Sequence, residues 1–234
     1  MARQARLSRP GLPLYIVQHG HDGQAIVRDD EDRAAWRTIL EQVIPASRVA
    51  LHAWALQDTA FHLVLTPVQE GEASRLMQLV GRRHAAAFNR RHARSGTLWD
   101  GRFRSCVVEP GAALLACMRR VDALGLGVDA QAAAETAEWS SLAHHIGQRA
   151  DPLLTDPPAY WALGNTPFER EAAWRRLIDE GLPAAEADRI AGAVRCGWPL
   201  GSSAFVASLA AAAGRPVGPQ RRGRPPGRKL ASGS

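Results

Sequence analysis

Residues 51–67 read LHAWALQDTAFHLVLTP, two strand-like apolar runs that are joined by a tight connection at Asp58-Thr59. Residues two apart in a strand project from the same face of a sheet. A His-hydrophobic-His triplet would therefore direct two imidazoles at one divalent cation. Here the triplet reads Ala60-Phe61-His62. The stretch predicts two adjacent strands that carry one histidine, His62, where a metal site would need two.

The segments on either side of these strands complete a regular order of elements. Strands are predicted at 14–18, 49–57, 61–66 and 103–109, and helices at 29–43, 71–92 and 112–124, from the spacing of apolar residues. The order β-α-β-β-α-β, followed by a helix, is typical of a ferredoxin-like or RRM-like antiparallel sheet with helices on one face. The predicted fold class is therefore α+β.

The residue pattern of the chain changes after residue 139. Prolines and aspartates interrupt residues 151–158, and helical spacing returns at 166–180, 184–194 and 202–213. We therefore expect a main domain at 1–148, a helical C-terminal appendage at 149–213, and a disordered basic tail at 214–234. A helix-turn-helix pair around Cys196–Gly201 and a small packing bundle are both compatible with this pattern.

Composition narrows the class of protein. The 234 residues contain no apolar run long enough to span a bilayer, and the first residues lack the apolar core of a signal peptide. The three cysteines share no CxxC spacing, so neither a disulfide framework nor a zinc knuckle is indicated. We expect no membrane partner and a cytoplasmic, nucleoid-associated location.

The positive charge of the chain is concentrated in two blocks. Residues 80–105 hold seven arginines against one acid, and residues 215–229 hold five arginines and one lysine without an acid. The formal net charge of the whole chain is only +6, so the remainder is acidic. Basic blocks on an acidic body are typical of nucleic-acid binders. A composition set by a GC-rich gene would also raise the arginine content, but it explains the clustering less well.

Several stretches, in order along the chain, resemble one family. They are LYIVQHG (14–20), RDDEDR (28–33), the 51–67 stretch, FNRRHARSGTLWDGRFRS (88–105), LLACM (114–118), WSS (139–141), LLTDPPAYWALGNTPFEREAAW (153–174) and RGRP (222–225). Together these resemble the REP-associated tyrosine transposases, relatives of the single-tyrosine HUH (IS200-like) transposases. The resemblance implies cleavage of single-stranded DNA, often beside hairpins. A divalent metal, held by two histidines and a third polar ligand, would polarise the phosphate that a tyrosine attacks.

Residue by residue, the resemblance also predicts that the cleavage centre is degenerate. The first histidine position is Ala60, the tyrosine position is Arg120, and the third ligand position, one helical turn later, is Leu124. Only His62 survives as a residual metal ligand, since alanine and leucine cannot ligate. We expect no catalytic residue and no cofactor in this chain; Mg²⁺ or Mn²⁺ would be required only if it were active.

A few other side chains could in principle replace the missing groups. The two tyrosines, Tyr15 and Tyr160, are expected to pack in the core or at an interface. Asp58 and Asp122, close in sequence to the lost ligands, would hold a metal only weakly. Two histidine pairs complete the set: His144-His145, expected as solvated surface residues, and His19 with His21, expected in a turn.

DNA binding is the property that we expect the chain to keep. The predicted contacts are arginines that can fork onto phosphates: Arg82, Arg83, Arg90, Arg91, Arg102, Arg104 and Arg120, with Arg222 and Arg224 in an AT-hook-like Arg-Gly-Arg-Pro of the tail. A solvated helix face, or nonspecific phosphate binding by the tail, would also explain them.

The sequence thus predicts a transposase-family protein that binds hairpin or single-stranded DNA, as a monomer or homodimer, without cleaving it. One alternative is an active metal-dependent nickase that uses Tyr15 or Tyr160 as a non-standard nucleophile. A second is a decaying copy without function, which the glycine-broken run Ala123–Val128 would fit. A covalent protein–DNA adduct would distinguish the enzyme from the binding protein.

Overall fold

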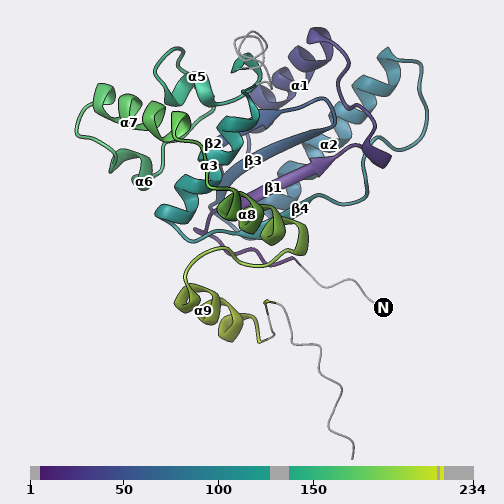
Figure 1. Cartoon of the computed structure of the whole chain (residues 1–234). Helices are drawn as coiled ribbons and strands as arrows, with labels where there is room; N and C mark the ends of the chain where they lie inside the picture. Colours follow the sequence, from purple (N-terminus) through teal and green to yellow (C-terminus); the bar gives the residue numbers. More distant parts are fainter. Residues whose placement is uncertain (1–5, 127–136, 215–216, 219–234) are drawn as a thin grey trace, which may run out of the picture.

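Four strands form one antiparallel sheet in the part of the chain that this computed structural model describes, residues 6–126, 137–214 and 217–218 (Figure 1). They are β1 (Leu14–His19), β2 (Val49–Leu56), β3 (Ala60–Pro67) and β4 (Arg104–Val107). The order is β2-β3-β1-β4, and every neighbouring pair is antiparallel. This is the strand order of a ferredoxin-like sheet, and the α+β fold class is confirmed.

One face of the sheet is covered by the two helices inside the β-α-β-β-α-β pattern. They are α1 (Asp30–Val43) and α2 (Glu72–Arg91), which pack against each other. Their apolar faces bury Trp36 and Phe88, and the ring of the fully buried Trp36 lies 5.3 Å from that of Phe61 on β3. The start of α1 is fixed by Asp29, whose side chain accepts a hydrogen bond from the backbone N–H of Asp32.

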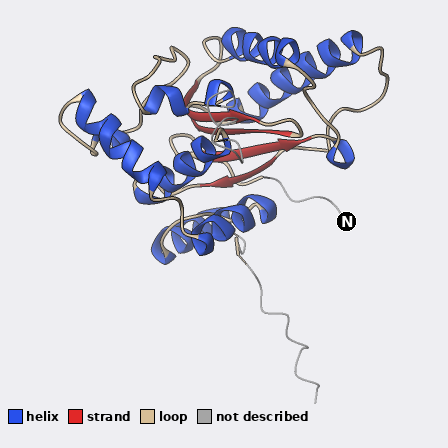
Figure 2. Ribbon diagram, turned by 45° about the horizontal axis from the view of Figure 1, so that its top comes forward, coloured by secondary structure: helices blue, strands red, loops and turns tan. Residues whose placement is uncertain are grey.

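The opposite face is also covered, which differs from the prediction that helices lie on one face only (Figure 2). Helix α3 (Ala112–Leu124) lies across β2 and β3 and buries Cys117, Met118 and Val121 in a second core. The prediction failed because strand residues such as Val17 and Val64 are apolar on this face too, and the sequence does not show what covers them.

The C-terminal segment covers most of the rest of this second face of the sheet. It contains α5 (Leu142–His145), α6 (Pro158–Trp161), α7 (Pro167–Asp179), α8 (Ala184–Cys196) and α9 (Ser203–Ala213). Helix α8 packs on β4, whereas α6 and α7 pack on α3. Tyr160, Trp174 and Ile190 are therefore part of the second core. Residues 149–213 thus pack on the sheet and α3, while the domain boundary near residue 148 stays a prediction.

A buried carboxylate connects α3 to this C-terminal segment. Asp122 is fully buried and accepts hydrogen bonds from the indole Nε1 of Trp174 at 2.8 Å and from Ser141 Oγ. It also bonds to Nδ1 of His145 at 2.7 Å. Burial alone lowers the pKa of His145, but attraction to Asp122 and the hydrogen bond to it raise that pKa above its ordinary value.

A bilayer-spanning helix would have to be long and continuously apolar. No helix in residues 6–126 and 137–214 meets both conditions.

Candidate nucleic-acid interface

The residues that the resemblance assigns to the cleavage centre meet on the α3 face of the sheet. On β3, Ala60 and His62 point to this face, and their partners on β1 are His19 and Val17. Tyr15, further along β1, donates its hydroxyl hydrogen to Nδ1 of His62 at 2.8 Å. The alternation read from the Ala60-Phe61-His62 triplet is therefore present, with Phe61 on the opposite face.

His62 itself is poorly suited to hold a metal. Nδ1 accepts from Tyr15, and Nε2 lies 3.3 Å from the amide oxygen Oε1 of Gln57, so both nitrogens have partners. Burial, together with the nearby charges of His19 and Arg120, lowers the pKa of His62 to about 3. Ala60 and Leu124 offer no ligand atom. The residues present do not fit the divalent metal that the resemblance implies.

The depressed pKa of His62 predicts a pH dependence of stability. Between its ordinary pKa of 6.5 and the folded value of about 3, the unfolded chain binds a proton that the folded chain does not. Stability therefore falls as pH falls through this window, by about 1.4 kcal/mol per pH unit from this residue. Urea unfolding at pH 6, 5 and 4 is expected to give a shallower dependence for His62→Gln than for the unmodified chain.

The matched control for this measurement is His21→Gln, because the side chain of His21 is 47% exposed. This variant should retain the full slope. If His62→Gln and the unmodified chain lost stability equally between pH 6 and pH 4, the buried neutral state of His62 would be contradicted.

Arg120 lies on α3 at the position where the resemblance expects the nucleophile. It is half-buried and close enough to His62 to lower the pKa of that imidazole. Burial raises the pKa of Tyr15 well above its usual range, and the guanidinium of Arg120 partly offsets this rise. The fold therefore brings Arg120, Tyr15 and His62 together from α3, β1 and β3.

A pocket opens at the end of β1. Its volume is about 320 Å³, and its lining comprises His19, Gly20, Asp22, Gly23, Thr59, Asp100 and Arg104. Arg104 is exposed and pairs with Val17 across β1 and β4, with Asp100 as a distant ion-pair partner at 3.9 Å. Burial and then the charge of Arg104 lower the pKa of His19. Arg104 on β4 and His62 on β3 both pair with Val17 of β1, so the pocket presents an arginine on the sheet face that carries His62.

Not all of the predicted DNA-binding arginines are equally available. Arg91 bonds to Asp29, Glu31 and Asp32, so it connects the end of α2 to the start of α1. Arg82 and Arg90 are exposed on α2, whereas Arg83 is exposed but donates to Gln42 at 3.2 Å. In the structure, Arg91 therefore holds α1 and α2 together through ion pairs.

The remaining predicted DNA contacts lie elsewhere. Arg102 is exposed but precedes β4, so the strand face that it was predicted to share with Arg104 does not form, because the strand begins only at Arg104. Arg222 and Arg224 lie outside the described residues. Their role in DNA binding stays a prediction.

Several solved structures are similar to this chain, and two of them are described here. A REP-associated tyrosine transposase bound to a REP hairpin aligns with a TM-score of 0.49 and 10% identity, over 68% of this chain and 93% of that chain. A protein from Deinococcus radiodurans R1, provisionally named a transposase, aligns with a TM-score of 0.36 and 13% identity, over 47% and 88%. No family model and no curated protein match the chain.

The two tyrosines are placed as packing residues, as predicted. Tyr15 is 1% exposed and Tyr160 is 4% exposed. The Tyr15 hydroxyl bonds to His62, and the Tyr160 hydroxyl donates to the carbonyl oxygen of His145 at 2.7 Å. A phosphate could reach neither hydroxyl without local unfolding.

The histidine pair 144–145 was predicted to be solvated, and for His145 this was wrong. His145 is fully buried, and its Nδ1 is hydrogen-bonded to the carboxylate of Asp122, which lies 23 residues earlier. The burial of His145 could have been predicted from one feature of the sequence: a histidine, a tryptophan and an acidic residue each lie on the apolar face of a helix. Asp58 is an exposed partner of Arg33, and His21 lies in the short 3-10 turn His21–Gly23.

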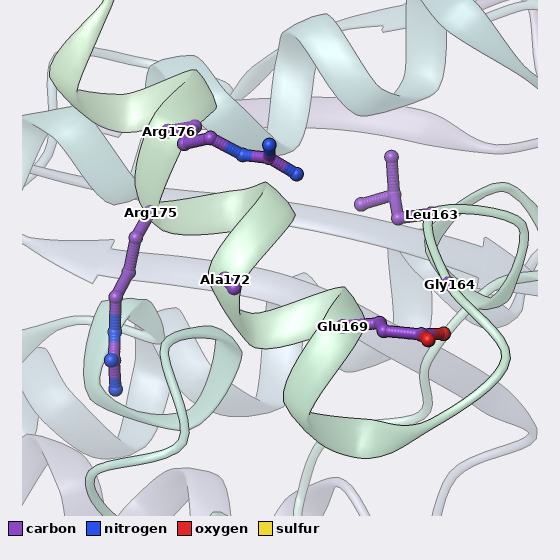
Figure 3. Close-up of a pocket in the computed structure, with 6 residues that line it drawn as sticks. All are labelled: Leu163, Gly164, Glu169, Ala172, Arg175 and Arg176. Atoms are coloured by element: carbon purple, nitrogen blue, oxygen red, sulfur yellow. The ribbon is translucent and has the colours of Figure 1, made fainter.

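A second pocket lies between α7 and the preceding loop (Figure 3). Its volume is about 490 Å³, and Glu169, Arg175 and Arg176 are its charged residues. Glu169 caps α7 by accepting from the backbone N–H of Asn165 and Thr166, and Arg175 donates to the carbonyl of Ile146. Two of the three charges are thus committed to local structure, so this pocket is a poor candidate site.

The predicted turn at Cys196–Gly201 connects α8 to α9. Gly197 has φ of +70°, a left-handed conformation that ends α8 and that glycine adopts without strain. Leu200 then pairs with the chain after β4, where Glu109 N–H donates to its carbonyl at 2.8 Å. A DNA-binding role for these two helices stays a prediction.

Proposed function

We propose that the chain is a transposase-like DNA-binding protein that grips hairpin or single-stranded DNA without cutting it. The proposal rests mainly on Arg120. Its guanidinium lies beside His62 and Tyr15, at the position where the resemblance expects a tyrosine to attack phosphorus. An arginine at that position cannot attack, but it can hold the same phosphate with charge-assisted hydrogen bonds.

Arg104 and the arginines of α2 would bind further phosphates of the same DNA, beyond the one held by Arg120. Arg104 is exposed on the edge strand and lines the pocket at the end of β1, and Arg102 is exposed just before it. Arg82, Arg83 and Arg90 lie on the helix that covers the other face, so we assign them to a second, outer phosphate contact. Arg222 and Arg224 are proposed to add minor-groove contacts from the tail.

The experiment compares DNA affinity across a salt series for the double variant Arg104→Ala/Arg120→Ala. The DNA is a labelled hairpin with a single-stranded flank, and the readout is fluorescence anisotropy. We expect affinity to fall about tenfold for each arginine, and the salt slope of log K to decrease by about 1.4, since each single-strand phosphate contact contributes about 0.7.

Arg48→Ala is the matched control, because Arg48 is exposed at the start of β2, the edge strand farthest from β4. It should leave both affinity and slope nearly unchanged. Arg120→Lys tests separately whether Arg120 binds phosphate through two parallel N–H donors. Lysine keeps the positive charge but cannot make this bidentate contact. Equal losses in the double variant and in Arg48→Ala would show a nonspecific charge effect and overturn the assignment.

A further inference from the structure

Two histidines and an aspartate gather where α5 meets the segment that precedes α6. The side-chain ligand atoms of His144, His145 and Asp156 all lie within 4.8 Å of one another. Nε2 of His144 and Oδ1 of Asp156 are 3.3 Å apart. Within the described ranges, no other three His, Cys, Asp or Glu side chains come together in this way. The cluster shares no residue with Arg120, His62 and Tyr15, or with the pocket at the end of β1.

His145 provides an independent sign that this cluster takes a ligand. The ring is fully buried, and its Nδ1 is bonded to Asp122 at 2.7 Å. Its Nε2 is also buried and makes no hydrogen bond. Buried polar atoms are rarely left unpaired in folded proteins. A carboxylate on one ring nitrogen with the other nitrogen unpartnered is how a metal-binding histidine is oriented.

We propose that His144, His145 and Asp156 bind a Zn²⁺ ion, with water as the fourth ligand. Two imidazoles and one carboxylate suit zinc, whereas Mg²⁺ prefers oxygen ligands throughout. Zinc bonds of about 2.0–2.1 Å place tetrahedral ligands roughly 3.4 Å apart. The three side chains must therefore draw in from their present spacing. The side chains of His144 and Asp156 are 21% and 20% exposed, which gives the ion a path from solvent.

Zinc binding has a specific local consequence. The backbone N–H of Asp151 donates to Nδ1 of His144 at 3.1 Å, so the metal-free ring carries its proton on Nε2. An ion on Nε2 displaces this proton, and the bond from Asp151 is lost when Nδ1 is protonated instead. The ion would then connect α5 directly to residue 156, beside Trp161 and Tyr160 of α6. This inference does not depend on the proposed DNA binding.

The test is a zinc titration of the chelator-treated full chain by isothermal calorimetry, with Mg²⁺ in a parallel titration. We expect one equivalent of Zn²⁺ to bind and Mg²⁺ not to compete. Asp156→Asn and His144→Ala are each expected to weaken zinc binding by about tenfold or more. Replacing a residue that only hydrogen-bonds to a metal ligand already lowers metal affinity by about that factor. Co²⁺ in place of zinc should give the visible absorption of a four-coordinate site.

His21→Ala is the matched control, because His21 and Asp22 form an exposed pair at 3.3 Å, the same spacing as His144 and Asp156. It should bind zinc like the unmodified chain. Near-ultraviolet circular dichroism shows whether each variant keeps its tertiary packing, and His145 is left intact because it supports Asp122. Zinc binding that is absent, or that is unchanged in both Asp156→Asn and His144→Ala, would overturn the proposal.

Discussion

Asp122→Ala is expected to lower the free energy of unfolding by about 3–5 kcal/mol, the cost of removing one partner of a buried ion pair. The carboxylate is fully buried and bonds to His145, Trp174 and Ser141. Its loss leaves the raised-pKa imidazole of His145 and the Trp174 indole N–H without an acceptor. Whole domains typically have a free energy of unfolding of only about 5–15 kcal/mol, so this loss would be a large fraction of the stability.

Urea unfolding, followed by tryptophan fluorescence, measures this effect. Asp122→Asn keeps the size and one acceptor oxygen, so it should lose less stability than Asp122→Ala. Asp58→Ala removes an exposed carboxylate from its pair with Arg33 and should cost little, as exposed pairs usually do. An Asp122→Ala variant as stable as Asp58→Ala would contradict the role assigned to this carboxylate.

The same variant examines how the C-terminal helices are attached. Trp174 comes from α7, and Asp122 comes from α3, so their bond crosses the predicted boundary at residue 148. If residues 149–213 unfold together with the sheet, Asp122→Ala should lower one cooperative transition. A separate appendage would instead give two transitions, with the loss confined to one of them.

The sequence predicted the elements closely because local patterns determine them. The helix predicted at 112–124 is α3, and the strand predicted at 61–66 is β3 with one residue more at each end. Apolar spacing and end signals such as Asp29 and Thr166 are read within a few residues of chain. The four-residue helices α5 and α6 were missed, since so short a run has no period to detect.

The candidate site was predictable only in part, and for a physical reason. The common face of Ala60 and His62 follows from strand alternation alone, and the resemblance suggested Arg120 as a neighbour. The bond from Tyr15 to His62 depends on strand register, which no local pattern gives. Likewise, Arg91 was predicted to hold DNA, and its pairing with Asp29 and Asp32 depends on how α1 and α2 pack.

The central proposal is that the chain holds DNA without cutting it. It rests on the residues at the positions that the resemblance assigns to cleavage: Ala60 and Leu124 cannot ligate, and both His62 nitrogens have partners. The hydroxyls of Tyr15 and Tyr160 are buried. Among the described residues, these positions therefore supply neither the metal ligands nor the nucleophile of the family. In contrast, Arg104 and Arg120 offer guanidinium donors for phosphate.

The most direct measurement uses one end-labelled hairpin with a single-stranded flank, incubated with the chain in Mn²⁺ or in EDTA. Each sample is divided between a native gel and a denaturing gel. We expect a salt-sensitive shift on the native gel that is equal in Mn²⁺ and EDTA, and uncut DNA on the denaturing gel. A Mn²⁺-dependent cut or a covalent protein–DNA adduct would contradict the account, and so would the absence of any shift.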